Sequence, residues 1–326
     1  MVEDIPFSCP EKGCAHSLLL ANERGLYCQN GHFFEYAEGT LIPIFSRTAE
    51  DKNEYTQACA AEIYDNALSW LFATFKTDEA TLRKNLLFRL NVKKGDSVLV
   101  TGAGTGSDLP YLALLLQGEG IIHAQDISAQ MLTAGALRHK AALSSAGVKA
   151  HFSVGDATQL PYGDGLFDAA YHFGGINLYS DIKLGIMEMV RVVKPGGRIV
   201  IGDEGLAPWL KTTEFGKILI KNNQLYEYDP PLTLLPETAV DVKLSWELSN
   251  CFYVIEFVNA KDKLQVNMDV PHKGRRGGSL RTRYFGQLEG VAPDLRDAFY
   301  ADAEKRGISR VEYIETALRA LLEKES

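Results

Sequence analysis

Short apolar runs and longer stretches with helical spacing alternate along the chain from about residue 95 onward. The apolar runs predict buried strands over 97–101, 121–125, 151–154, 167–173 and 198–202. Because helical stretches separate most of these runs, they predict a parallel sheet with right-handed crossovers. Two further runs, 243–247 and 252–258, follow each other closely and predict an antiparallel edge. We therefore expect an α/β fold built on a doubly wound, seven-stranded and mostly parallel sheet.

The chain ahead of this sheet predicts a small module and two helices. Residues 1–47 are turn-rich, and they are too few to form a stable core without a cross-link such as a bound metal. The charged and polar stretch 46–54 predicts a linker, and apolar residues at helical spacing over 60–75 and 80–90 predict two helices. These helices and the sheet together make up the expected main domain, residues 55–262.

The tail, residues 270–326, has a different composition from the rest of the chain. Its first part carries basic residues among glycines: Lys273, Arg275, Arg276, Arg281 and Arg283. Apolar residues on one stripe predict a helix over 293–306 that ends before Gly307. The capping box Ser309-Arg-Val-Glu312 predicts the start of a second helix. We therefore expect a basic loop followed by a strand-helix-helix unit.

Charge and composition narrow the classes of function. The 326 residues include 34 Lys plus Arg against 42 Asp plus Glu, which gives a formal net charge of -8. An acidic total disfavours non-specific binding to the polyanionic backbone of nucleic acids, although a local basic patch can still bind it. The first residues lack the features of a targeting leader, and no run approaches the ~20 apolar residues of a membrane span. We therefore expect a cytoplasmic protein without a membrane span.

A glycine-rich turn follows the first predicted strand, in the sequence VLVTGAGTGSDLPY from Val98 to Tyr111. Glycines at 102, 104 and 106 let the backbone approach a ligand, and the helix that follows presents free N–H groups. A dinucleotide fingerprint needs its third glycine at the position of Ser107. The Gly-x-Gly-x-Gly spacing instead favours S-adenosylmethionine, which has no pyrophosphate to bind.

Two acidic residues follow at the ends of the next two predicted strands. Asp126 comes about twenty residues after the glycine turn, where a carboxylate accepts hydrogen bonds from both ribose hydroxyls of either cofactor. Asp156 lies in the segment GDATQLPY, where a carboxylate accepts from the exocyclic amine of adenine while a neighbouring backbone N–H binds a ring nitrogen. A nicotinamide domain has no particular need for this second acid, so the pair again favours S-adenosylmethionine.

From about Val92 to Asp203 these ordered motifs resemble those of the class I S-adenosylmethionine-dependent methyltransferases, which have a Rossmann-like fold. The segments FGGINLYSD and RVVKPGGR are similar to those of the ubiquinone and menaquinone C-methyltransferases and their small-molecule relatives, the methyltransferase type 11 group. The resemblance implies a cofactor-binding set with Gly102, Gly104 and Gly106 at the methionine part, Asp126 at the ribose with Ile127 beside it, Asp156 and Ala157 at the adenine, and Phe173 at the cofactor's flank.

One residue departs from the pattern of this family. Where such enzymes commonly have an acidic residue at the end of the first strand, this chain has Val100. Asp108 is then a candidate for holding the ammonium group of the cofactor. The alternative is that these residues bind no cofactor. The glycines would then only close a βα turn, and Asp126 and Asp156 would be solvated acids in loops.

The methyl group on a sulfonium is already electrophilic, so the protein mainly has to align a nucleophile about 3 Å away and exclude water. Residues at the ends of the fourth and fifth strands can reach it: His172, Asn177, Tyr179, Asp203 and Glu204. His172 is the leading candidate for a base or an acceptor-orienting group, and its alternative is a hydrogen-bonded wall histidine. Glu204 is the second catalytic candidate, and its alternative is a helix cap.

The spacing Cys9-x4-Cys14 and Cys28-x3-His32 provides two knuckles that can close a tetrahedral zinc site. The outline resembles the zinc-ribbon modules fused to some methyltransferases, including bacterial large-subunit rRNA guanine methyltransferases. Zinc here would be structural and would replace the missing core. The first knuckle is wider than usual and His16 competes as a ligand, so free buried thiols are the alternative.

The last fifty or so residues resemble a ribbon-helix-helix unit, with RTRYFGQLEGV as the strand and the two predicted helices after it. In that fold the paired strands of two chains read DNA, although the same fold also serves only to form dimers. Such a tail would allow the chain to form a homodimer. The negative net charge of the chain disfavours nucleic acid as a partner.

The sequence therefore predicts an enzyme that moves a methyl group from S-adenosylmethionine to a small, cyclic or phenolic acceptor by C-, O- or N-methylation. The helices before Gly95 and the segment Trp209–Pro236 are expected to form the lid that selects this acceptor. One alternative is an rRNA or tRNA base methyltransferase that grips RNA with the zinc module and the basic tail. A second is a nonenzymatic, cofactor-sensing regulator that binds DNA.

Overall fold

The computed structural model describes residues 6–14, 17–46, 59–263, 265–284, 288 and 291–324. The chain divides into two compact units, Met1–Lys263 and Leu264–Ser326, and each is described by itself. Of the predicted linker 46–54 only Ser46 lies among the described residues, and His16 lies outside them.

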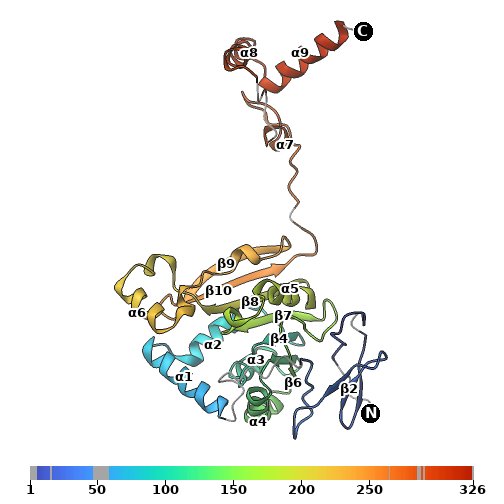
Figure 1. Cartoon of the computed structure of the whole chain (residues 1–326), viewed down its shortest axis with the longest axis vertical. Coiled ribbons are helices and arrows are strands. Elements are labelled where there is room, and N and C mark those ends of the chain that lie inside the picture. The colour runs from blue at the N-terminus through green and yellow to red at the C-terminus, as the bar shows by residue number, and fades with distance from the viewer. Residues whose placement is uncertain are drawn as a thin grey trace. The chain divides into compact units, whose positions relative to one another are not determined.

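The first unit contains a seven-stranded sheet with the strand order β6-β5-β4-β7-β8-β10-β9 (Figure 1). Its strands are β4 (Ser97–Thr101), β5 (Ile121–Asp126), β6 (Lys149–Val154), β7 (Phe167–Phe173), β8 (Val193–Glu204), β9 (Ala239–Glu247) and β10 (Phe252–Asn259). Strands β4 to β8 pair in parallel, whereas β10 pairs antiparallel with both β8 and β9. The predicted fold is confirmed, and every predicted strand of the sheet lies within an observed one.

Helices cover both faces of this sheet. They are α1 (Ala60–Thr74), α2 (Glu79–Phe88), α3 (Leu109–Leu115), α4 (Ala129–Ser145), α5 (Ile182–Val192) and α6 (Glu214–Asn222). Side chains of α2, α3 and α4 share one hydrophobic core with Val98 and Val100, while α5 packs with Leu99 on the opposite face. Neighbouring residues of a strand point to opposite faces, which explains this division. Among the described residues, no helix is both long and apolar enough to cross a membrane.

The segment between β8 and β9, in which the acceptor lid was expected, contains α6 and three short 3-10 helices. These are η3 (Pro208–Leu210), η4 (Gln224–Glu227) and η5 (Leu232–Leu234). Tyr226 of η4 is buried against the rings of Phe75 and Phe252, so this segment is anchored to the core. Its role as a lid remains a prediction.

The two glycines of the RVVKPGGR motif lie within a strand and not between a helix and a strand. Helix α5 already ends at Val192, and β8 begins at Val193, so Gly196 and Gly197 lie inside the strand. The pairing of β7 with β8 changes register across this stretch. A Cβ atom on Gly197 would stand 2.6 Å from the carbonyl oxygen of Asp168, so glycine lets the two strands approach here.

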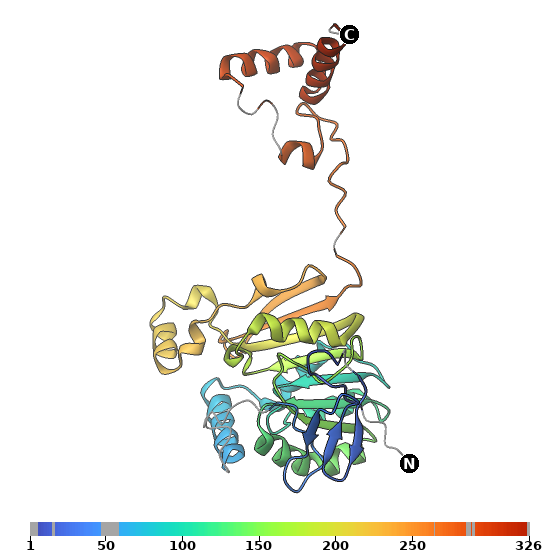
Figure 2. The same cartoon turned by 45° about the vertical axis from the view of Figure 1, so that its right-hand side comes forward.

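The predicted small module is a three-stranded antiparallel sheet formed by β1 (Leu20–Asn22), β2 (Gly25–Tyr27) and β3 (Phe33–Glu35). It is coloured dark blue in Figures 1 and 2. The connection from β6 to β7, residues 155–166, contains no helix. Instead, Phe7 and Phe34 of the module share a hydrophobic cluster with Tyr162 and Phe167, so the module covers this part of the sheet.

The second unit contains α7 (Leu280–Tyr284), α8 (Pro293–Lys305) and α9 (Arg310–Lys324). The two predicted helices are confirmed, as is the cap of α9, where the hydroxyl of Ser309 accepts a hydrogen bond from the N–H of Glu312 at 3.2 Å. The predicted strand is wrong for residues 281–284, which are helical, while much of the remaining RTRYFGQLEGV segment lies outside the described residues. A strand needs a partner for its backbone, whereas a helical turn satisfies its hydrogen bonds locally.

Candidate cofactor and metal sites

The glycine turn at the carboxyl end of β4 has three residues in the left-handed region. The φ angles of Gly102, Gly104 and Gly106 are 59°, 54° and 73°. A Cβ atom on Gly102 would stand 2.8 Å from Cε1 of His172, so a side chain at this position would collide with the histidine ring. The three glycines predicted to border the cofactor therefore form one tight turn in a backbone conformation that favours glycine.

Asp126, at the end of β5, holds this turn from the side. Its Oδ2 accepts a hydrogen bond from the N–H of Gly104 at 2.8 Å, and its Oδ1 accepts one from the N–H of Ser128 at 2.8 Å. Each oxygen keeps a second lone pair, which is what a pair of ribose hydroxyls requires. Burial raises the pKa of Asp126, and the backbone N–H donors oppose that rise.

Asp156 lies next to Asp126 in space, as the sequence predicted. The N–H of Gly155 donates to the carbonyl oxygen of Asp126 at 2.9 Å, which joins the two strand ends. The Oδ1 atom of Asp156 accepts hydrogen bonds from the N–H and the hydroxyl of Thr158 at 2.8 and 2.7 Å, and these fix the carboxylate. The side-chain amide of Gln125 also donates to the carbonyl of Gly155.

Three apolar residues of the predicted cofactor set have different surroundings. Ile127 follows Asp126 and is 53% exposed, so it presents an apolar surface beside that carboxylate. Ala157 is buried in the cluster that the main domain shares with the module. Phe173 stacks on Phe252 with ring centroids 5.8 Å apart. All three come from the strand ends or loops that carry the polar residues.

Asp108, the candidate for the ammonium group, already has a cationic partner. Nη1 of Arg83 lies 2.9 Å from its Oδ1, and Nε of the same arginine bonds to Glu79 at 2.7 Å. Arg83 is buried. Sequence reasoning missed this arginine because α2 lies outside every recognised motif. The Arg83–Asp108 ion pair places a buried cation and an anion close to the glycine turn, and the ammonium role of Asp108 remains a prediction.

The end of β8 carries two acids with different functions. Oδ1 of Asp203 accepts from the N–H of Gly175 at 3.0 Å, and its Oδ2 accepts from the N–H of Asn177 at 2.7 Å. Asp203 therefore accepts hydrogen bonds from backbone N–H groups at the start of the short helix η2 (Ile176–Leu178). Burial, followed by the hydrogen bond and charge of Asp203, raises the pKa of Glu204 to about 9. This shift favours the protonated form of Glu204 at neutral pH.

His172 lies beneath the glycine turn and has no exposed surface. Its Nδ1 lies 3.0 Å from the carbonyl oxygen of Thr101 and 3.2 Å from the hydroxyl of Tyr179. Its Nε2 is buried without a partner among the described residues. Burial lowers the pKa of His172, which favours the neutral ring. These contacts favour a role for His172 as part of the wall of the site or as a group that orients the acceptor. That His172 acts as a base remains a prediction.

Helix α4 contributes two contacts to the turn that sequence reasoning missed. A Cβ atom on Gly135 would stand 2.7 Å from the carbonyl oxygen of Thr105, so the helix packs directly on the turn's backbone. One turn further along, Nε2 of His139 lies 3.1 Å from the same oxygen. A glycine within a helix costs up to about 1 kcal/mol relative to alanine, which is a signal of close packing that the sequence does contain.

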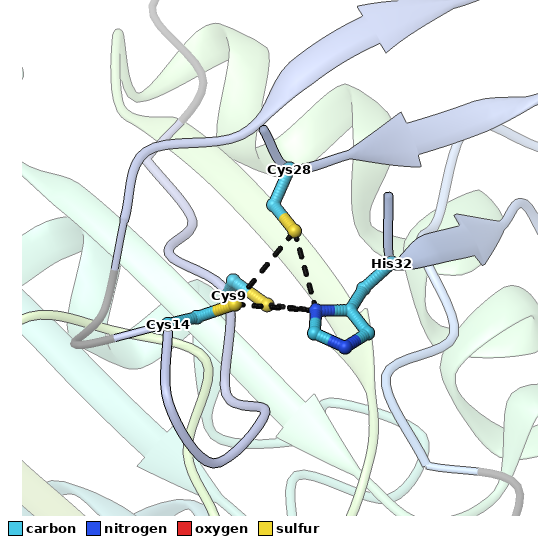
Figure 3. Close-up of side chains that lie close together, drawn as sticks. All are labelled: Cys9, Cys14, Cys28 and His32. Carbon is cyan, nitrogen blue, oxygen red and sulfur yellow. Dashed lines mark hydrogen bonds between the residues drawn. The ribbon is translucent and has the colours of Figure 1, made fainter. Parts of the chain in front are cut away.

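The predicted metal ligands do converge. Figure 3 shows the sulfurs of Cys9, Cys14 and Cys28 and the Nδ1 of His32 pointing toward one another. These four atoms all lie within 4.8 Å of one another. Cys14 Sγ is 3.8 Å from Cys28 Sγ, and the three sulfurs are 3.2 to 3.6 Å from Nδ1.

These separations fit a tetrahedral zinc ion. With zinc bonds of about 2.3 Å to sulfur and about 2.0 Å to nitrogen, ligand atoms stand about 3.5 to 3.8 Å apart. The three cysteines are buried. The side-chain amide of Asn30 donates to Cys14 Sγ at 3.1 Å, the kind of outer contact that orients a thiolate ligand. The group therefore fits zinc, with two thiolates from the first loop and a thiolate and an imidazole from the loop between β2 and β3.

The seven-stranded sheet with its antiparallel edge, and the glycine turn and acid pair at the carboxyl ends of β4 to β6, form the arrangement that the resemblance to the class I S-adenosylmethionine-dependent methyltransferases implies. Residues 98–197 match the model of a family described as a methyltransferase domain. The central part of the chain is therefore similar to a methyltransferase domain in both sequence and fold.

Curated relatives point in the same direction. A demethylmenaquinone methyltransferase of Beutenbergia cavernae is 33% identical over 159 residues, which is 45% of this chain and 61% of that protein. One of Corynebacterium glutamicum is 36% identical over 121 residues, which is 37% of this chain and 47% of that protein. The chain thus spans about half the length of the curated relatives it matches.

A solved structure shares the fold. Phosphoethanolamine N-methyltransferase 2 of Haemonchus contortus, in complex with S-adenosyl-L-methionine, superposes with a TM-score of 0.50 and 15% sequence identity. The match covers 67% of this chain and 62% of that chain.

Proposed function

We propose that this chain transfers a methyl group from S-adenosylmethionine to a small cyclic or phenolic acceptor. The observation that carries the proposal is the carboxylate of Asp126, which binds the N–H of Gly104 and still has lone pairs for two hydroxyls. The match of residues 98–197 to a methyltransferase domain supports the same reaction.

S-adenosylmethionine would supply a methyl group on a positively charged sulfur, which is already activated for transfer. The chain's own residues bind and orient it. Asp126 binds the ribose, Asp156 binds the adenine, and the left-handed turn at Gly104 lets the methionine end approach the backbone. The carboxylate of Asp108, in its ion pair with Arg83, lies at the start of the helix that follows this turn.

At the acceptor side, Glu204 and His172 have complementary properties. The raised pKa of Glu204 favours a protonated carboxyl, whose one O–H group bonds to Asp203 in this structure and would turn to an acceptor oxygen once the acceptor is bound. Neutral His172, with its Nδ1 held by Thr101, keeps a lone pair on Nε2. A phenolic or hydroquinone acceptor needs both a donor to its oxygen and a place for its proton, and this pairing favours that class.

The relatives suggest which acceptor to test first. Because two of them are demethylmenaquinone methyltransferases, demethylmenaquinone is the first candidate. It is offered in its reduced form, since a methyl acceptor must be nucleophilic. A simple catechol and ribosomal RNA complete the panel.

The test has two stages. Calorimetry of S-adenosylhomocysteine with the full chain should show saturable binding, and its absence would overturn the proposal. Transfer of a tritiated methyl group to the quinol or the catechol is the expected second result. Label found in RNA alone would contradict a small-molecule acceptor and would support the RNA alternative.

For the metal cluster we propose structural zinc, held by Cys9, Cys14, Cys28 and His32. The distances between the ligand atoms and the hydrogen bond from Asn30 support this assignment. A zinc site needs reduced cysteines, which suit a reducing compartment and so support a cytoplasmic location.

For the second unit we propose self-association through α8 and α9. Leu295, Leu318, Leu321 and Leu322 are all more than half exposed in the single chain. A second copy of the same helices offers matching leucines and the same mixture of acidic and basic residues. Sedimentation of the full chain should give a dimer that Leu318→Glu converts to a monomer, and a monomeric parent chain would overturn the proposal.

A further inference from the structure

The metal cluster lies next to residues 155–162, which carry Asp156 and are called the adenine loop below. Cys9 is the ligand that connects the two. The residues on both sides of this ligand bind the segment that carries Asp156. The N–H of Ser8 donates to the carbonyl oxygen of Pro161 at 2.8 Å. On the other side, the side-chain amide of Gln159 donates to the carbonyl oxygen of Pro10 at 2.6 Å. Any displacement of Cys9 therefore acts directly on residues 155–162.

A second connection reaches the same loop from its other end. Residues 43–45 run alongside the end of β6, where Ile44 forms a parallel bridge with Val154. The N–H of Val154 donates to the carbonyl of Pro43 at 2.9 Å, and the N–H of Phe45 donates to the carbonyl of Val154 at 2.7 Å. Val154 directly precedes Gly155, so the module holds the loop at the point where it leaves the sheet.

Between these connections the module and the loop share one apolar core. The ring of Phe7 lies 5.3 Å from that of Phe45 and 5.6 Å from that of Tyr162. Ala157 and Leu160 of the loop are buried in the same cluster as the three cysteines. The loop between β6 and β7 has no helix of its own, so this core supports it on the module's side, while Glu188 and Arg191 of α5 hold the backbone of residues 160 and 162.

The module depends on its ligands for order. Its three strands have three residues each, and such a short sheet with so small a core is only marginally stable without a staple. Metal binding to such modules is coupled to their folding. Loss of the metal therefore removes the order of the residues that hold the loop.

We propose that metal binding by the Cys3His cluster positions the adenine loop, so that metal occupancy sets the affinity for S-adenosylmethionine, with Gln159 as the positioning residue between them. This inference rests on the proposed function, because it takes residues 155–162 as the adenine side of the cofactor site. By linkage the coupling is reciprocal, so the bound cofactor also strengthens metal retention.

The first experiment measures S-adenosylhomocysteine binding by calorimetry, with the full chain loaded with zinc and after removal of zinc by a chelator. Removal should weaken binding about 5- to 100-fold, the usual range of coupling between two sites. Re-addition of zinc should restore the affinity. Equal affinities with and without zinc would overturn the proposal.

Hydrogen exchange without cofactor separates this proposal from the proposed function. Zinc removal should deprotect residues 43–45 and 155–162 while the glycine turn at 102–106 keeps its protection. Uniform loss across the sheet would mean general unfolding and would overturn the proposal. If zinc-loaded protein shows no cofactor binding but does show this local pattern, the proposed function fails while the mechanical coupling stands.

A variant tests the route. Gln159→Leu removes the hydrogen bond to Pro10 and leaves all four metal ligands in place. It should retain zinc, bind S-adenosylhomocysteine several-fold more weakly than the parent, and show a smaller ratio between zinc-free and zinc-loaded affinities. Gln265→Leu, at an exposed glutamine of the second unit, is the matched control and should behave like the parent. An unchanged ratio in Gln159→Leu would remove this residue from the route.

Discussion

The carboxylate of Asp126 accepts a hydrogen bond from the backbone N–H of Gly104 at 2.8 Å, which links the end of β5 to the turn after β4. Asp126→Asn replaces one acceptor oxygen with an amide nitrogen that cannot accept from an N–H group. Because hydrogen bonds to charged groups contribute about 1.5–3 kcal/mol, the affinity for S-adenosylhomocysteine should fall about 10- to 100-fold. Calorimetry measures this, and the exposed Asp262→Asn serves as the control. Unchanged affinity in a folded Asp126→Asn protein would contradict the assignment.

Gly135→Ala tests the packing of α4 on the glycine turn. Alanine should stabilise a helix interior by up to about 1 kcal/mol, but here its Cβ would stand 2.7 Å from the carbonyl oxygen of Thr105. We expect lower thermal stability and weaker cofactor binding. Ala134→Gly is the reverse control at the neighbouring position, and it should lower stability while leaving affinity unchanged. A stabilised Gly135→Ala protein with normal affinity would show that the backbone at Thr105 can move to accommodate the added Cβ, and would contradict this prediction.

Glu204→Gln tests the protonation of the buried acid. Burial, then the hydrogen bond and charge of Asp203, raise the pKa of Glu204 from 4.5 to about 9. Between these values the folded chain keeps a proton that the unfolded chain has released. The free energy of unfolding therefore falls as the pH rises, by at most about 1.4 kcal/mol per pH unit from this group.

Glu204→Gln lacks this dependence, so its stability relative to the parent should increase from about pH 5 to pH 9. Urea unfolding at pH 5, 7 and 9 measures the difference. Glu38→Gln, at an exposed site in the module, should show no such trend. A difference that does not change with pH would mean that Glu204 is ionised in the folded chain at neutral pH.

Cys14→Ser tests the metal cluster. The purified parent should contain about one zinc ion per chain, because four ligands converge on a single point. Cys14→Ser should lose the metal and lower the temperature of unfolding, since the module then lacks its staple. Cys251→Ser changes a buried cysteine far from the cluster in sequence and should keep the zinc. Metal analysis and thermal unfolding decide the matter, and a zinc-free parent would contradict the site.

Much of the fold was predictable because its strands are buried on both faces. Such strands form continuous apolar runs, and for β4 and β7 even the predicted bounds agree with the structure. The approach of Asp126 and Asp156 was also predictable, because parallel neighbours end at the same edge of a sheet. The metal ligands were found for a similar reason, since each pair lies within one short loop.

Features that depend on distant parts of the chain could not be predicted. Arg83 joins Asp108 only after α2 packs beside the glycine turn, and no local pattern indicates such a pair. In the same way, nothing in residues 155–166 indicated that the module would take the place of a helix there. The strand expected at 281–284 is helical because a strand depends on a partner that a single tail does not contain.

The bridge between Ile44 and Val154 has one more consequence, for solubility. Strand β6 lies at the outer edge of the main sheet, and an uncovered edge strand can pair with strands of other molecules. By pairing with Val154, the module covers the end of this edge and leaves less of it open to such pairing. Preparations that lose their metal should therefore precipitate more readily on storage than preparations that retain it.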